Sequence, residues 1–171
     1  MDQKAMNEYL DQWLRDAHAM EEQATTMLTT QASRIEHYPE LKQKMEQHIR
    51  ETESQRDRLE ACLTRRGTSP SGAKDIAAKF TAMGQGLSGT VMGDEVVKGA
   101  MASYTFEHFE ISAYRELIGA ADIVGDHETK RVCEEILKEE QAMADWLYEQ
   151  LPVVSRTFLE RAGSDAAEAK R

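Results

Sequence analysis

The length, composition and charge of the chain set the first limits on its fold and partners. Its 171 residues, 40% of them hydrophobic, are enough for one ordinary domain with a real core. The formal net charge is −10 and no block of Lys or Arg occurs, so neither nucleic acid nor an anionic membrane surface is an expected partner.

The absence of long apolar runs limits the location of the protein. No stretch approaches 18 apolar residues, and the N-terminus MDQKAMNEYLDQW is charged and amphipathic, which is unlike a membrane span or a signal peptide. Cys62 and Cys133 are too few and too far apart for a disulfide framework or a cysteine zinc site. We therefore expect a cytoplasmic protein whose cysteines are reduced core residues.

The local sequence signals predict an all-α chain with four long helices. Few prolines and glycines interrupt the chain, and Ala, Glu, Gln, Lys, Met and Leu dominate it. Pro39 is placed to open the second helix, Asp94 to cap the third, Gly125 to end the third and Asp126 to cap the fourth. The predicted helices are about 2–33, 39–66, 94–124 and 126–150.

The segments between and after these helices predict the topology. Residues 67–72 form a loop signal, 75–92 predict one short helix in a loose crossover, and Pro152 is expected to end the fourth helix before a short helix at 153–161. Two short connections and one long connection make two antiparallel helix hairpins joined by a crossover. The prediction is one domain, residues 1–163, with the layout of a ferritin-like four-helix bundle and a polar tail at 164–171.

Four glutamates lie on or beside the apolar seams of these helices. Glu21 and Glu51 are thirty residues apart, and Glu110 and Glu140 repeat that separation 89 positions later. Burying an ionised carboxylate without a partner costs far more than folding usually leaves available. An internal duplication would bring the four acids to one level of the bundle, which indicates a shared cation site. The alternative is that acids at the edge of a stripe are solvated or ion-paired.

Longer motifs resemble a known family over nearly the whole chain. They are the runs DQWLRDAHAMEEQ at 11–23, YPEL at 38–41, EQH at 46–48 with ET at 51–52, FEHFEISAY at 106–114 and EEQAMADWL at 139–147. These runs are similar to the YciE/YciF family of bacterial ferritin-like stress proteins, nearest to its YciE branch. The resemblance implies a ferritin-like bundle, expected to be a homodimer, that is made under osmotic or general stress.

The wider ferritin-like group binds two Fe or Mn ions through one Glu from each of two helices and a Glu-x-x-His from each of the other two. This chain has Ser54 and Met143 at the two histidine positions, while His or Glu precedes three of the glutamates by three residues. The predicted ligands are therefore Glu21, Glu51, Glu110, Glu140, His48, Glu107 and His18, with Tyr114 and Gln55 as outer partners of the ligands. For His18, His48 and Tyr114 the open alternative is an ordinary packed or solvated side chain.

Three functions remain open at this point. The first is a dinuclear Fe or Mn protein that handles iron, oxygen or peroxide as a ferroxidase, peroxidase or catalase-like oxidoreductase. The second is a metal-free structural or protein-interaction bundle induced by stress. The third is a storage protein, which needs a closed shell that a dimer does not supply.

Overall fold

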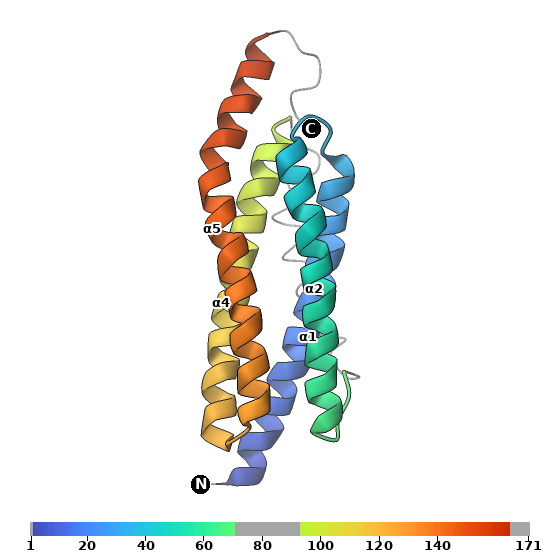
Figure 1. Ribbon diagram of the computed structural model, residues 1–171, viewed down its shortest axis with the longest axis vertical. Helices are drawn as coiled ribbons and strands as arrows, with labels where there is room; N and C mark the ends of the chain where they lie inside the picture. The colour runs from blue at the N-terminus through green and yellow to red at the C-terminus, as the bar shows by residue number, and fades with distance from the viewer. Residues whose placement is uncertain (1, 71–92, 165–171) are drawn as a thin grey trace.

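The computed structural model describes residues 2–70 and 93–164, and in this part of the chain the fold consists of long helices without strands. The helices are α1 Gln3–Arg34, α2 Pro39–Arg65, α4 Glu95–Val124 and α5 His127–Gly163. They run along one common long axis, and α5 extends beyond the ends of its neighbours (Figure 1). The predicted all-α bundle is confirmed. The predicted short helix and crossover at 75–92 and the tail from 165 onward lie outside the described residues.

The ends of the helices follow from local sequence. The Asp2 carboxylate accepts hydrogen bonds from the backbone N–H groups of Lys4 and Ala5, and Asp126 accepts one from Thr129, which satisfies donors that a helix start leaves unpaired. Gly125 ends α4 with φ of 80°, a left-handed conformation that costs glycine little. The turn between α4 and α5 can therefore be short, and the two helices form a hairpin.

The helices pack so that each has two neighbours. α1 contacts α2 and α4, and α5 contacts α4 and α2. One apolar cluster includes Leu14, Leu59 and Ile136, and a second includes Met45 and Leu147. Along α2 and α5, His48 and Glu140 lie between residues of these two clusters, whereas Glu107 and Glu110 on α4 lie between Phe106 and Tyr114 of the first cluster. Apolar packing therefore lies on both sides of these polar side chains along the bundle.

The expected break at Pro152 does not occur, and no separate short helix follows it. α5 continues through Pro152 to Gly163. Pro152 lies on the exposed side of the helix, where water can hydrate the carbonyl that loses its hydrogen bond. Val154 is buried and Phe158 packs against the second apolar cluster. These contacts hold the last turns of α5 in line with the rest of the helix.

An ion-pair network ties three helices together at the end of the bundle that carries the α4–α5 turn. Asp126 accepts hydrogen bonds from Arg65 Nη2 at 2.6 Å and from Arg66 Nη1 at 2.7 Å. Arg66 Nε also donates to Asp11 on α1 at 2.5 Å. Burial by itself would raise the pKa of Asp126, but these hydrogen bonds and that from Thr129 lower the pKa well below its usual value.

We expect Asp126→Ala to lower the free energy of unfolding by roughly 2–4 kcal/mol, because it removes a helix cap and one of the two carboxylates that pair with the largely buried Arg66. Urea denaturation would measure the loss. The matched control is Asp57→Ala, which breaks an exposed pair with Arg56 and should change stability by less than about 0.5 kcal/mol. Equal losses in the two variants would contradict the role of the network.

Candidate metal centre

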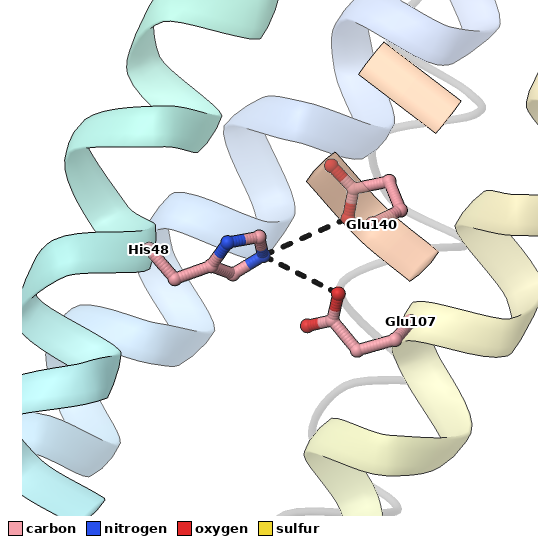
Figure 2. A group of neighbouring side chains, drawn as sticks. All are labelled: His48, Glu107 and Glu140. Carbon is pink, nitrogen blue, oxygen red and sulfur yellow. Dashed lines mark ion pairs between the residues drawn. The ribbon is translucent and has the colours of Figure 1, made fainter. Parts of the chain in front are cut away.

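Three side chains from three helices meet in the interior of the bundle. His48 on α2, Glu107 on α4 and Glu140 on α5 are each no more than 1% exposed. His48 Nε2 lies 3.3 Å from Glu107 Oε2 and 3.6 Å from Glu140 Oε2, and Figure 2 shows the imidazole pointing between the two carboxylates. One potential ligand atom from each residue lies within 4.8 Å of the others. This is the size of a group that one cation can draw together.

Glu51 lies on the outer side of His48. Its Oε2 is 2.9 Å from His48 Nδ1, and Gln47 Nε2 donates to its Oε1 at 2.7 Å. The hydrogen bond with His48 lowers the pKa of Glu51 to about 2, so Glu51 is the acceptor and Nδ1 carries the proton. The imidazole is thereby fixed with Nε2 toward Glu107 and Glu140.

Glu21 and Glu110 are two further buried acids. Glu21 on α1 is 0% exposed and Glu110 on α4 is 1% exposed. The Tyr114 hydroxyl donates a hydrogen bond to Glu21 Oε1. Glu140 is the largest electrostatic influence on the pKa of each after burial. The α1 and α4 acids therefore lie within electrostatic range of the same α5 carboxylate that faces His48.

The electrostatics of the metal-free cluster are unfavourable to charge. Burial is the largest cause that raises the pKa of Glu21 and Glu110 well above the usual value, and the Glu140 carboxylate is the next. Burial also raises the pKa of Glu107 to about 8, although His48 acts in the opposite direction. Burial by itself lowers the pKa of His48, but Glu107, Glu140 and Glu51 outweigh it, so that pKa is raised well above its usual value. Without a metal ion, these raised pKa values favour protonated side chains in the cluster.

Several oxygens of these acids have no hydrogen-bond partner within the described part of the chain. The contacts of His48 Nε2 are within ion-pair distance but are not hydrogen bonds. The buried, unpartnered atoms are Glu21 Oε2, Glu107 Oε2, Glu110 Oε1, Glu140 Oε1 and Glu140 Oε2. Buried polar atoms in folded proteins almost always have partners. Four carboxylates, one imidazole and this set of open oxygens fit two divalent cations of the Fe or Mn type, which favour carboxylate oxygen with some nitrogen.

A further polar group extends the cluster toward the surface. Gln55 is 0% exposed, and its Nε2 donates to Glu139 Oε2 at 2.9 Å. Arg58 also donates to Glu139, while Gln55 Oε1 is buried without a hydrogen-bond partner within the described residues. Glu139 and Arg58 are not among the residues predicted from the sequence. The seam position of Gln55 could have indicated them, because a buried amide needs a partner on the facing helix.

The structure brings most of the predicted residues together, but not all of them. The buried seam of α2 passes through His48, Thr52 and Gln55, so Glu51 stands beside it, 31% exposed, as a partner of His48. His18 is 6% exposed and its Nε2 has no hydrogen-bond partner within the described residues. It is not one of the residues whose ligand atoms group together. The residues that share the interior cluster are Glu21, His48, Glu107, Glu110 and Glu140, with Tyr114 and Gln55 beside them.

Comparison with known proteins places the chain among similar bundles. A family model described as "Domain of unknown function (DUF892)" matches residues 5–160. A protein of known crystal structure from Xanthomonas campestris pv. campestris shares 42% sequence identity with this chain. The two structures match with a TM-score of 0.79 over 92% of this chain and 99% of that one. YcfI from Rhodopseudomonas palustris, described as a putative structural protein, is 26% identical with a TM-score of 0.72, over 84% of this chain and 92% of that one.

The E. coli stress protein YciF is a third solved structure of this shape. It is 20% identical with a TM-score of 0.72, over 85% of this chain and 94% of that one. The predicted kinship with YciE/YciF-like proteins is confirmed, and placement nearest to the YciE branch stays a prediction. Within residues 2–70 and 93–164, no helix is both long enough and apolar enough to cross a membrane.

Proposed function

This chain belongs to the DUF892 family, and we propose that it is a stress-associated protein with a carboxylate-rich dinuclear Fe or Mn centre that handles iron, oxygen or peroxide. The observation that carries the proposal is the set of buried carboxylate oxygens without hydrogen-bond partners in the described bundle, among them both oxygens of Glu140, which groups with His48 and Glu107. Two divalent cations would neutralise four ionised carboxylates. Without them the fold would retain a cost that proteins normally avoid.

The residues of this chain would hold and shield such ions. His48, Glu107 and Glu140 supply one group of donors, Glu21 and Glu110 supply the other acids, and Glu51 orients His48. A bound Fe or Mn pair would supply redox chemistry with oxygen or peroxide. Leu14, Ile136 and their neighbours exclude water from one end of the cluster, which strengthens every electrostatic interaction inside it.

Metal analysis tests this proposal directly. Protein purified aerobically after growth with Fe or Mn should contain about two ions per chain, as the dinuclear arrangement requires. Glu21→Ala should lose that stoichiometry, because it removes a buried acid of the cluster. The matched control is Glu22→Ala on the exposed face of the same helix, which should keep it. Wild-type protein without stoichiometric transition metal would overturn the proposal.

Glu51→Gln is expected to weaken metal binding by about 10–100-fold without removing a ligand, because the amide no longer fixes the proton on His48 Nδ1. Isothermal titration with Mn²⁺ would measure the loss. Glu53→Gln on the exposed side of α2 is the control and should bind like wild type. An unchanged affinity in Glu51→Gln would show that Glu51 does not orient the ligand.

A metal-free structural bundle is the second candidate. It is favoured by the description of the 26%-identical YcfI as a putative structural protein, and by pKa shifts that let Glu107 and its neighbours be neutral near pH 7. Under this function the metal analysis gives no stoichiometric ion in any growth medium.

A storage role requires a closed shell, so a particle of dimer size in size-exclusion chromatography would exclude it.

The proposal includes a cytoplasmic homodimer. Its support is an apolar groove between α1 and α4 lined by Tyr9, Trp13 and Ile123, which are 58%, 41% and 69% exposed in the single chain. Exposed apolar patches of this kind mark interaction surfaces. Light scattering of the purified protein tests the dimer, and a monomeric mass at micromolar concentration would contradict it.

A further inference from the structure

We propose that the two cation positions of this centre are unequal and fill in a fixed order, the first ion between His48, Glu107 and Glu140 and the second at Glu21 and Glu110. This inference rests on the proposed function, because it describes how the same centre loads. It concerns which side chains bind each ion, and it is independent of what the loaded protein does.

The first position is assembled before any ion arrives. One donor atom of each of its three residues already lies within 4.8 Å of the others. The three residues come from three different helices (Figure 2), so helix packing sets their spacing. Glu51 and Gln47 hold the imidazole from behind. An ion that enters this position needs little rearrangement, which favours tight binding.

The second position is not assembled in the same way. Within the described residues, the donor atoms of Glu21 and Glu110 do not join the group of three. Glu21 has one oxygen engaged by the Tyr114 hydroxyl, which leaves Oε2 without a hydrogen-bond partner, and Glu110 has Oε1 without one. Among the described residues, no histidine forms a comparable group with these two acids. The second ion must therefore draw carboxylates together and bind through oxygen alone.

Glu140 connects the two positions. Both of its oxygens are buried without hydrogen-bond partners inside the described bundle. Its Oε2 lies 3.6 Å from His48 Nε2, and its charge also acts on Glu21 and Glu110. Before any ion binds, ionising Glu21 or Glu110 places a second negative charge near Glu140 in the buried interior. A divalent ion at the first position neutralises Glu107 and Glu140. The remaining pair of acids then carries the charge that attracts a second divalent ion.

The donor types make the two positions chemically different. Imidazole with two carboxylates raises affinity along the series from Mn²⁺ through Fe²⁺ to Co²⁺, whereas carboxylates alone also suit Mn²⁺ and Mg²⁺. The first position should therefore select transition ions more strongly than the second.

Two substitutions one helical turn apart on α4 test the order of loading. The metal-free full-length chain is titrated with Co²⁺ and followed by calorimetry and visible absorption. Wild type should show two events, with the first about tenfold or more tighter, as expected when one site has an oriented histidine and the other does not. Glu110→Gln should keep the first event and lose the second. Glu107→Gln should weaken the first event about tenfold or more.

The possible outcomes distinguish a failure of the loading order from a failure of the proposed metal-binding function. Two equal sites in wild type, or equal effects of Glu107→Gln and Glu110→Gln on both events, would overturn the order while leaving a metal centre. No Co²⁺ binding by wild type would overturn both. Titration of wild type with Mn²⁺ gives a readout that needs no variant. Electron paramagnetic resonance should show the signal of a single bound Mn²⁺ with one equivalent, broader than that of the free ion, and spin coupling between two ions with the second equivalent. Coupling from the first addition onward would also contradict ordered loading.

Discussion

Glu140→Gln is expected to abolish stoichiometric metal uptake and, at the same time, to raise the stability of the metal-free protein. Glu140 lies beside His48 and carries two buried oxygens without hydrogen-bond partners within the described residues, so both ions would lose a ligand. Without metal, the same carboxylate raises the pKa of Glu21 and Glu110, and removing its charge relieves that repulsion. The expected gain at pH 8 is roughly 1–3 kcal/mol.

Metal analysis and urea denaturation of the chelator-treated protein would measure the two effects of Glu140→Gln. Glu149→Gln, on the exposed side of the same helix, should change neither. Wild type should also gain about 2.7 kcal/mol for each site whose dissociation constant is exceeded 100-fold by free metal, and Glu140→Gln should gain nothing. A variant that still binds two ions, or one that is less stable without metal than wild type, would contradict this account.

The metal-free protein is expected to lose stability as pH rises from 4.5 through about 8. Glu107 has an ordinary pKa of 4.5 and a folded pKa of about 8, raised first by burial. A group with a raised folded pKa binds more protons in the folded state, so its stabilising contribution is complete below the unfolded pKa and is lost as pH passes the folded one. The pKa values of Glu21, Glu110 and His48 are also raised, and they act in the same direction.

Chelator-treated protein should therefore unfold more easily in urea at pH 8.5 than at pH 5.5, by at least about 1.4 kcal/mol, which corresponds to one pKa unit of one group. Glu51 does not oppose this change, because its pKa of about 2 lies below the window. Metal should reverse the trend, since each ion replaces protons and binds more tightly at higher pH. Metal-free stability that rises across this window would show that the acids are not buried as protonated groups.

The bundle and most of its centre follow from helical periodicity. Glu21, Glu110 and Glu140 interrupt apolar stripes that repeat every three or four residues, and all three are buried in the structure. Periodicity fixes a face only to within about half of a helix turn. It places Thr52 on the stripe of α2 and Glu51 at its edge, but it cannot decide which side chain Glu51 contacts, because that depends on how α2 is rotated against α1 and α5. Tertiary packing turns Thr52 inward and leaves Glu51 to hold His48.

Two other features depended on contacts between distant segments. Pro152 is a helix breaker by local preference, but Val154 and Phe158 pack against the second apolar cluster and keep α5 continuous. Glu139 gains its role from Gln55 and Arg58, which are more than 80 positions away in the chain. Local signals do not contain this pairing, because it depends on the register of α2 against α5.

Anomalous X-ray diffraction from crystals of Mn-loaded protein tests the central claim most directly. The account predicts two peaks inside the bundle, one among His48, Glu107 and Glu140 and the other at Glu21 and Glu110, with Glu140 adjacent to both. Crystals grown with excess Mn²⁺ that show no peak among these side chains, or show the carboxylates paired with Arg or Lys side chains, would contradict it.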